Sequence, residues 1–271
     1  MNKNIAVLGC GWLGIPLAKK LIELGYIVHG STQTPSKLSE LKSEGIIPFF
    51  IKLNETQTEG DLKAFLENCH LLIINIPPGL KKHPETSFVN KIKSFLFHLE
   101  ELTNFKIIFI SSTSVFKDSP DISCYDEFSI PNSNVSSGIQ LAKTETLLLS
   151  KPNLDAKIIR FGGLFGGRRH PAKFLSNKLL KSPHAPVNLI HLEDCLGLIL
   201  KVISFKGAQL IFHGVYPDHP KKMDYYSSIC KTQNIEPPLA TDYKSVGKII
   251  NSDITSKLLN FNYKINLFAT R

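Results

Sequence analysis

The chain has 271 residues, 42% of them hydrophobic, enough to bury a full core in one large domain or in a domain with an appended lobe. No apolar run approaches the roughly 20 residues that a membrane-spanning helix needs, so we expect no membrane span. The formal net charge is +9, but its cations are mostly lysines spread along the chain. This pattern favours a solvated basic surface and a small anionic ligand over nucleic acid.

The five cysteines are odd in number and lack the spacing of metal ligands, and the nine histidines form no metal-binding cluster. We therefore expect reduced thiols and no metal site. The first residues lead directly into an apolar segment and leave no room for a secretory signal. Together these features predict a cytoplasmic protein.

Short hydrophobic runs alternate with amphipathic stretches through the first part of the chain. We predict strands at residues 4–8, 26–30, 46–53, 71–76, 106–110 and 156–161. Between them we predict helices at residues 16–24, 36–44, 88–102 and 137–150. Strands that are hydrophobic throughout and separated by helices indicate a parallel sheet covered on both faces.

A glycine-rich turn, Gly9-Cys10-Gly11-Trp12-Leu13-Gly14, follows the first predicted strand and opens the first helix. In such a turn Gly9 permits the tight bend, Gly11 lets backbone amides approach a pyrophosphate, and Gly14 allows close packing of helix on strand. The helix N-terminus adds amides and a partial positive charge. We therefore predict a dinucleotide site here, with Trp12 and Leu13 as further contacts and Trp12 packing against the turn.

The glycine turn and the alternating elements together predict an α/β fold, a Rossmann doubly wound parallel sheet of about seven strands with a small C-terminal α/β substrate lobe. After about residue 165 the rhythm breaks into shorter elements with many prolines. We predict a nucleotide-binding domain at 1–165, completed by about 187–212. Residues 166–186 and 213–271 would form the lobe.

The end of the second predicted strand bears on the choice of cofactor. It reads His29-Gly30-Ser31-Thr32-Gln33, without the carboxylate that binds the ribose hydroxyls of NAD, and Lys37 follows. Ser31, Thr32, Gln33 and Lys37 are therefore candidate contacts to a 2′-phosphate, which favours NADP over NAD. The alternative is that these are ordinary loop residues and the acid is dispensable.

The loops at the carboxyl ends of the other strands line the cofactor crevice in this architecture. They contribute further candidate contacts, namely Ile76, Pro77, Pro78, Ser111, Phe161, Gly162 and Gly163.

Four segments, in the same order, make the sequence similar to the extended short-chain dehydrogenase/reductase superfamily, the NAD-dependent epimerase/dehydratase group. They are VLGCGWLG at 7–14, ISSTSVF at 110–116, RFGGLFG at 160–166 and NLIHLED at 188–194. The resemblance implies an NAD(P)-dependent enzyme that uses a Ser or Thr ending the fifth strand and a Tyr-x-x-x-Lys pair on the next helix. Ser112, with Thr113 beside it, matches the first of these.

The Tyr-x-x-x-Lys pair is missing. One alignment puts Ser137 at the tyrosine position and Leu141 at the lysine position, whereas anchoring on Lys143 puts Ile139 at the tyrosine position. Tyr125 is the nearest tyrosine, in a predicted upstream loop. Serine has a far higher pKa than tyrosine, so the ordinary proton relay is expected to be absent. Ser112, Thr113, Ser137 and Lys143 remain the catalytic candidates, and a solvent-facing Lys143 is the alternative.

Arg168, Arg169 and His170 follow the segment RFGGLFG at 160–166, which ends the sixth predicted strand, where the substrate lobe is expected to begin. An arginine there could hold a carboxylate or phosphate, and a histidine could titrate near neutral pH. A solvated basic loop is the alternative. For His191 and Asp194 we expect structural hydrogen bonds.

Two functions follow from these patterns. The first is an NAD(P)-binding, epimerase/dehydratase-like oxidoreductase of altered mechanism that acts on a small anionic or sugar-like substrate. The second is a non-catalytic NAD(P)-binding redox sensor or scaffold. The apolar positions of 88–102 permit a homodimer.

Overall fold

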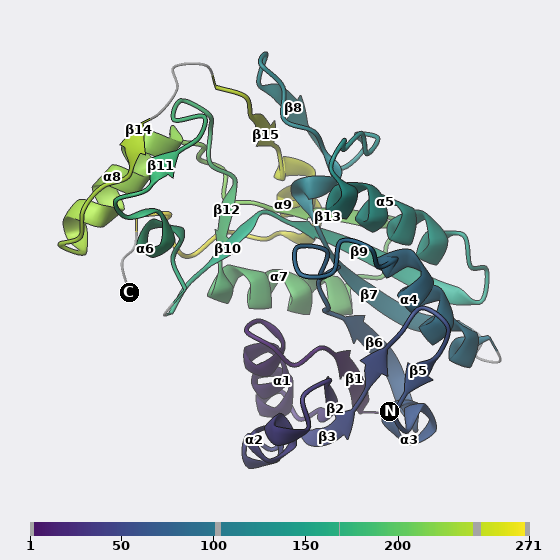
Figure 1. Ribbon diagram of the computed structural model, residues 1–271. Coiled ribbons are helices and arrows are strands. Elements are labelled where there is room, and N and C mark those ends of the chain that lie inside the picture. Colours follow the sequence, from purple (N-terminus) through teal and green to yellow (C-terminus); the bar gives the residue numbers. More distant parts are fainter. Residues whose placement is uncertain (1–2, 101–103, 168, 241–244, 269–271) are drawn as a thin grey trace. The chain divides into compact units, whose positions relative to one another are not determined.

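A computed structural model describes residues 3–100, 104–167, 169–240 and 245–268 of the chain (Figure 1). The chain forms two compact units. Unit 1 comprises Met1–Ser111 and Ser136–Ile159, and unit 2 comprises Ser112–Val135 and Arg160–Arg271. The predicted boundaries divide the chain into a nucleotide-binding domain and a substrate lobe. This division assigns a function to each part, and it stays a prediction.

A parallel sheet forms the centre of unit 1. Its strands are β1 (Asn4–Leu8), β2 (Ile27–Thr32), β3 (Ile47–Phe50), β6 (Cys69–Ile74), β7 (Phe105–Ser112) and β9 (Leu154–Phe161), with β13 (Ile211–Gly214) from unit 2 next to the end of β9. The order β13-β9-β7-β6-β1-β2-β3 places β1 between β6 and β2, with Val7 opposite Gly30 on one side and Ile73 on the other. The predicted fold class, a seven-stranded doubly wound sheet, is confirmed.

Helices cover both faces of this sheet. They are α1 (Gly14–Glu23), α2 (Leu38–Ser43, after the 3-10 turn Pro35–Lys37), α3 (Leu62–Leu66), α4 (Phe88–Leu96, followed by the 3-10 turn Phe97–Leu99) and α5 (Ser136–Leu149). The strand order reverses at β1, so right-handed crossovers put α1 and α2 on one face and α4 and α5 on the other, as Figure 1 shows. Ile5, Ala6 and Val7 are consequently buried on both sides.

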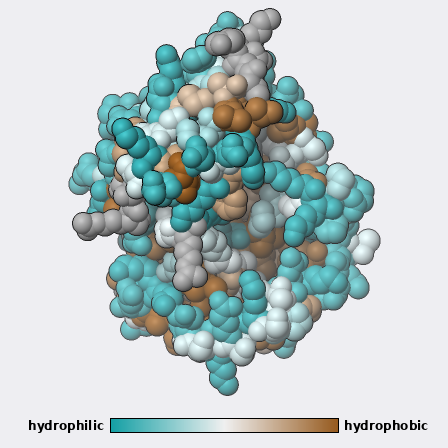
Figure 2. Space-filling view, turned by 60° about the vertical axis from the view of Figure 1, so that its left-hand side comes forward, coloured by the Kyte–Doolittle hydropathy of each residue, from teal (hydrophilic) through white to brown (hydrophobic). Residues whose placement is uncertain are grey.

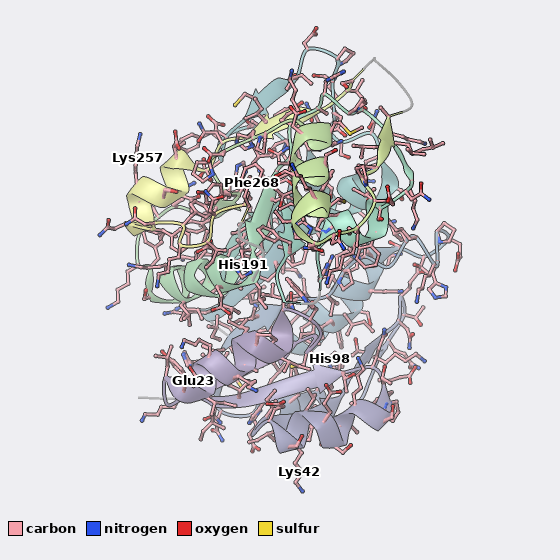
Figure 3. All side chains as sticks on the ribbon, turned by 90° about the vertical axis from the view of Figure 1, so that its left-hand side faces the viewer. Glu23, Lys42, His98, His191, Lys257 and Phe268 are labelled. Atoms are coloured by element: carbon pink, nitrogen blue, oxygen red, sulfur yellow. The ribbon has the colours of Figure 1, made fainter. Side chains whose placement is uncertain are left out.

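Helix α1 shows how the sequence pattern selects the buried face. Leu17, Ala18 and Leu21, spaced three and four residues apart, are buried, whereas Glu23 is exposed. Figure 3 shows Glu23 on α1 and Lys42 on α2 pointing outward.

Two predicted elements differ from the structure, and one helix was not predicted. The strand predicted at 46–53 ends at Phe50, and β4 (Lys52–Leu53) instead pairs antiparallel with β5 (Thr58–Glu59). The short helix α3 was not predicted from periodicity; it begins where the Asp61 side chain accepts a hydrogen bond from the Ala64 amide. The helix predicted at 88–102 is α4 and a 3-10 turn, with its last two residues outside the described ranges.

Unit 2 consists of short elements. They are the 3-10 turn Thr113–Val115, β8 (Ser123–Tyr125), β10 (Gly163–Phe165), α6 (Pro171–Leu175), β11 (Leu179–Leu180), β12 (Leu189–His191), α7 (Leu192–Ser204), β13, α8 (Lys222–Thr232), β14 (Leu239–Ala240), β15 (Lys248–Ile250) and α9 (Asp253–Leu259). Strands pair in parallel as β10 with β12, β11 with β14 and β15 with β8. Phe165, Tyr225, Ile229 and Leu267 pack in one core of this unit.

The face in Figure 2 is mainly hydrophilic, with separated hydrophobic patches. Among the described residues, no helix is both long enough and apolar enough to span a bilayer.

Candidate functional site

The glycine turn is held by hydrogen bonds from the two strands that flank β1. The Gly9 amide donates to Ser31 Oγ at 3.0 Å, and the Cys10 amide donates to the Ser31 carbonyl at 2.8 Å. From the other side, Asn75 Nδ2 donates to the Gly9 carbonyl at 2.9 Å. The turn is therefore fixed before any ligand binds.

The three glycines have different surroundings. Gly9 has φ +106°, a conformation that favours glycine, and a Cβ there would lie 2.5 Å from the Asn75 carbonyl oxygen. A Cβ on Gly14 would lie 2.2 Å from the Gly9 carbonyl oxygen, so the start of the helix lies directly against the turn. A Cβ on Gly11 would meet nothing within 4 Å. Gly11 thus leaves open space where a ligand can approach the backbone.

A pocket of about 570 Å³ lies beside this turn, within unit 1. Nine of the predicted cofactor contacts line it, namely Gly9, Gly11, Ser31, Thr32, Gln33, Lys37, Ile76, Pro77 and Pro78. The described lining leaves out Trp12, Leu13 and Gly14. Gly14 packs directly against the Gly9 carbonyl, and Trp12, within the turn, is half-buried. No side chain caps the N-terminus of α1. Pro16 has no N–H, and the amides of Ile15 and Leu17 donate to the carbonyls of Gly11 and Leu13, so the helix end offers an anion mainly its partial positive charge.

Lysines give the pocket lining its charge, and one of them, Lys52, is ion-paired with Glu59 at 3.2 Å. Lys37, Lys52, Lys91 and His83 line it, and the described lining contains no carboxylate. Cys10 also lines it, but burial raises the pKa of the Cys10 thiol to about 12, so the thiol stays protonated. This environment suits a ligand with several phosphate charges.

Several pocket residues were not predicted, namely Ile51, Lys52, Leu53, Asn54, Asn75, His83, Thr86, Phe88 and Lys91. Residues 51–54 and Asn75 directly follow β3 and β6, so the rule that ligands bind at the carboxyl ends of strands could have found them. Residues 83–91 carry no such signal. Gln140 of α5 holds this segment, because Phe88 N donates to its Oε1 and its Nε2 donates to the Thr86 carbonyl.

The catalytic candidates on helix α5 differ in their exposure to solvent. Ser137 is half-buried and Lys143 is exposed, while Leu141, at the lysine position of one alignment, is only 4% exposed. Ser111, a predicted cofactor contact, is buried and donates to Glu145 Oε1 at 2.5 Å. The Ser111 hydroxyl therefore joins β7 to α5.

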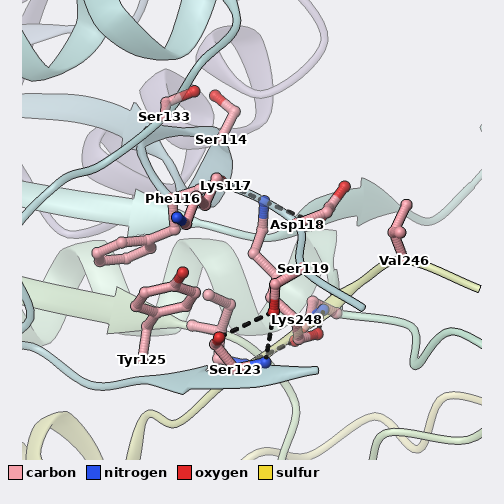
Figure 4. Close-up of polar contacts among 12 residues, drawn as sticks. Ser114, Phe116, Lys117, Asp118, Ser119, Ser123, Tyr125, Ser133, Val246 and Lys248 are labelled. Carbon is pink, nitrogen blue, oxygen red and sulfur yellow. Dashed lines mark hydrogen bonds and ion pairs between the residues drawn. The ribbon is translucent and has the colours of Figure 1, made fainter. Parts of the chain in front are cut away.

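Ser112 and Thr113 lie at the start of unit 2, where β7 ends in a 3-10 turn. Ser112 Oγ accepts a hydrogen bond from the Ser114 amide at 3.1 Å, and Thr113 is buried. Lys248 holds the residues that come after this turn in the sequence, as Figure 4 shows. Lys248 Nζ donates to the Phe116 carbonyl at 2.6 Å and pairs with Asp118 at 3.2 Å.

Tyr125, the nearest tyrosine that precedes α5 in the sequence, ends β8, so the predicted loop is wrong at this residue. Its ring stacks on Phe116 at a centroid distance of 4.5 Å, and its hydroxyl accepts from Asn132 Nδ2 at 3.2 Å. The pairing of β8 with β15 and this stack fix the ring within unit 2.

Phe161, Gly162 and Gly163 form a closely packed corner of unit 2. Phe161 is buried, and the amides of Gly162 and Gly163 donate to the carbonyls of Gly214 and Asn188. A Cβ on Gly162 would lie 2.6 Å from the Asn188 carbonyl oxygen. Their glycine character is thus explained by packing, and their contact with a cofactor stays a prediction.

The predicted substrate residues differ in their surroundings. Arg168 lies outside the described residues, and Arg169 is exposed. His170 is 6% exposed; its Nδ1 accepts from the Ala172 amide and its Nε2 contacts the Tyr225 hydroxyl at 3.1 Å. Tyr225 donates to the Leu267 carbonyl, so His170 must donate through Nε2.

The expected titration of His170 near neutral pH is wrong. Burial, with smaller contributions from Lys173 and His191, lowers the pKa of His170 to about 4. A neutral imidazole with both nitrogens occupied caps α6 and supports the core.

His191 and Asp194 have the structural hydrogen bonds expected of them. His191 begins α7 and accepts from the Glu193 amide at 3.2 Å; Figure 3 shows it beside this helix. The Asp194 carboxylate accepts from the amides of Lys264 and Ile265 at 2.8 and 3.2 Å. Across the parts of the chain that the structure describes, no three His, Cys, Asp or Glu side chains come together as metal ligands.

Comparison with known proteins identifies solved structures that share this fold. The chain resembles three solved structures, each of which covers 98% of it. A functionally unknown conserved protein from Silicibacter pomeroyi has a TM-score of 0.80 at 17% identity over 95% of its own chain. UDP-glucose 4-epimerase from Thermotoga maritima, solved with UDP-glucose, has a TM-score of 0.79 at 16% identity over 95%. UDP-glucuronic acid 4-epimerase from Bacillus cereus, solved with NAD, has a TM-score of 0.78 at 16% identity over 93%.

These likenesses show that the chain has the fold of these three proteins, two of which are UDP-sugar 4-epimerases. In sequence, the chain is similar to Protein YeeZ of Escherichia coli K12, with 28% identity over 265 residues, which are 97% of this chain and 96% of YeeZ. No protein-family model matches the chain.

Proposed function

We propose that the pocket of unit 1 binds NADP or NADPH and that the protein is an epimerase/dehydratase-like oxidoreductase working without the Tyr-x-x-x-Lys pair. Its substrate is a small anionic or sugar-like molecule. The observation that carries this proposal is the pocket beside the glycine turn, lined by Lys37, Lys52, Lys91 and His83 with no carboxylate in its described lining.

The sign of the charge favours NADP over NAD. A carboxylate at the end of β2 would accept hydrogen bonds from the ribose hydroxyls of NAD and repel a 2′-phosphate. Ser31 and Thr32 take that place here. Each hydroxyl oxygen already accepts a backbone amide, from Gly9 and Thr34, so its proton is available to a ligand oxygen. Lys37 supplies the charge that offsets the phosphate.

The remaining roles follow the fold. The glycine turn and the N-terminus of α1 hold the pyrophosphate. A bound nicotinamide would accept or supply hydride. Ser112 and Thr113 orient a substrate oxygen, Phe161, Gly162 and Gly163 lie under the nicotinamide, and Arg168 or Arg169 binds the anionic group of the substrate. His170 has no place in this proposal, because its nitrogens are used in unit 2.

Calorimetric titration with NADPH, NADP, NADH and NAD in parallel tests the proposal. We expect NADPH to bind at least tenfold more tightly than NADH. Lys37→Ala should weaken NADPH binding by about 10- to 100-fold, the value of one charge-assisted contact, and leave NADH almost unchanged. Lys63→Ala, an exposed lysine of α3 outside the pocket, is the matched control. Failure of all four dinucleotides to bind would overturn the proposal.

One observation favours the second function, a non-catalytic redox sensor. Leu141 is buried in α5 at the position where one alignment expects the catalytic lysine. A sensor should bind NADPH and NADP with very different affinities and oxidise no NADPH. An enzyme should oxidise NADPH slowly with a member of a panel of carbonyl compounds.

A further inference from the structure

Backbone contacts in unit 2 bring two lysines next to the same short segment. The amide of Lys222, the first residue of α8, donates to the Ala185 carbonyl at 2.8 Å. Gly247 also packs on this residue, because a Cβ on Gly247 would lie 2.8 Å from the Cβ of Ala185. Lys248 follows Gly247 and begins β15. Lys222 and Lys248, far apart in sequence, are therefore both held near Ala185.

Lys248 is fixed by its neighbours but keeps one hydrogen-bond donor. Its side chain is only 14% exposed, and its Nζ donates to the Phe116 carbonyl at 2.6 Å and to Asp118 Oδ1 at 3.2 Å (Figure 4). Ser119 and Gly247 exchange two backbone hydrogen bonds, which hold Asp118 beside β15. An ammonium group has three N–H donors, so one donor of Lys248 is left for a ligand.

Lys222 differs from Lys248 in its partners. Its side chain is half-buried, and among the described residues no hydrogen bond or ion pair involves its Nζ. Burial lowers the pKa of Lys222, while the charge of Asp118 raises it and the charge of Lys248 lowers it. Both charges therefore lie close enough to act on the Lys222 ammonium. A partly buried charge without a hydrogen-bond partner is unfavourable, and an anionic ligand would supply the missing acceptor.

The balance of charge indicates the kind of anion. Two ammonium groups share one carboxylate, and this carboxylate, Asp118, is 50% exposed and already bonded to Lys248. A phosphate group has a charge of about −2 near neutral pH and three oxygens that accept hydrogen bonds. A carboxylate has a single charge and two oxygens in one plane. Phosphate therefore fits two ammonium groups on separate segments better than a carboxylate does.

We propose that Lys222 and Lys248 together form a binding site for a phosphate group in unit 2. Neither lysine has a part in the proposed function, and the pocket proposed for the cofactor is lined by residues of unit 1. Asp118 has two opposing effects in this site. It positions Lys248 through their hydrogen bond, and its negative charge weakens the binding of the phosphate.

NMR titration of the full chain without any dinucleotide tests the site, with inorganic phosphate, glycerol phosphate and acetate as probes. We expect both phosphates to bind at least tenfold more tightly than acetate and to shift the amide signals of residues 183–188 and 220–223. Tighter binding of glycerol phosphate identifies an ester as the ligand, and equal binding identifies the free ion. Either result supports the site.

Variants assign the binding to these side chains. Lys222→Gln should weaken phosphate binding about tenfold, because one charge-assisted contact is lost, whereas Lys222→Arg should stay within about threefold of the wild type. Asp118→Asn should strengthen binding about fivefold, because asparagine still accepts from Lys248 and does not repel the anion. Lys231→Gln, at an exposed position near the other end of α8, should keep the wild-type affinity.

Three results would overturn the inference. They are failure of both phosphates to bind the wild type more tightly than acetate, equal weakening by Lys222→Gln and Lys231→Gln, and weaker binding by Asp118→Asn. Thermal unfolding of each variant identifies a loss that comes from misfolding, and in that case the comparison of Lys222→Arg with Asp118→Asn decides the test. Since no dinucleotide is present, these results are independent of the proposed function.

Discussion

Alanine at Gly14 should lower the stability of the protein strongly and alanine at Gly11 should leave it almost unchanged, although the two glycines belong to one turn. A Cβ on Gly14 would lie 2.2 Å from the Gly9 carbonyl oxygen, where ordinary contacts are 3.4–4 Å. The turn and α1 must therefore move apart by about 1 Å. The Gly9 carbonyl and amide are held by Asn75 and Ser31, so this movement disturbs both hydrogen bonds.

The expected cost of Gly14→Ala combines three contributions. Overpacking costs about 1–3 kcal/mol, and each disturbed hydrogen bond about 1 kcal/mol. The higher helix propensity of alanine returns up to about 1 kcal/mol. The net loss is about 2–4 kcal/mol in the free energy of unfolding, measured by urea denaturation without ligand.

Gly11→Ala is the matched control, because its Cβ would meet nothing within 4 Å. We expect the free energy of unfolding to change by less than about 0.5 kcal/mol. The added methyl group nevertheless fills space in the pocket lining, so NADPH binding should weaken at least tenfold. Equal stability losses in both variants, or unchanged NADPH binding by Gly11→Ala, would refute this account of the turn.

Two further predictions concern buried polar groups. His170 has a folded pKa of about 4, below the usual 6.5, so the unfolded chain takes up a proton in this interval that the folded protein does not. The contribution of His170 to stability should be complete above pH 6.5 and fall by about 2–3 kcal/mol as the pH falls to 4.5, beside a separate contribution from His213, whose pKa burial also lowers to about 4. His170→Gln should remove only the His170 part of the slope in urea denaturation across that range. Glu145→Ala should cost about 2–3 kcal/mol, because it leaves the buried Ser111 hydroxyl without this acceptor, whereas Lys143→Ala on the exposed face of α5 should cost less than about 0.5 kcal/mol. An unchanged pH slope in the first case, or equal costs in the second, would contradict these interpretations.

The regular part of unit 1 could be predicted because its signals are local. Each buried strand is a hydrophobic run, and the glycine turn has its three glycines at a spacing that only a strand-to-helix junction requires. Since the carboxyl ends of parallel strands meet at one edge, residues far apart in sequence such as Ser31 and Pro77 could be placed in one pocket.

The remaining features depend on contacts between distant segments. Lys52 pairs with Glu59 in a hairpin of two-residue strands, too short to produce a periodic pattern. Lys91 and His83 reach the pocket because Gln140 ties their segment to α5. His170 resembled a titratable loop histidine, but its burial against Tyr225 is set by unit 2 as a whole. A local pattern in one sequence does not indicate which distant residues interact in these ways.

Hydrogen–deuterium exchange with and without saturating NADPH tests most directly whether unit 1 holds the cofactor. The account predicts slower exchange in peptides that cover residues 8–14, 31–37, 51–54 and 75–79, and no comparable change around α8. Binding of NADPH without protection at the glycine turn, or with protection only in unit 2, would contradict the assignment of the pocket.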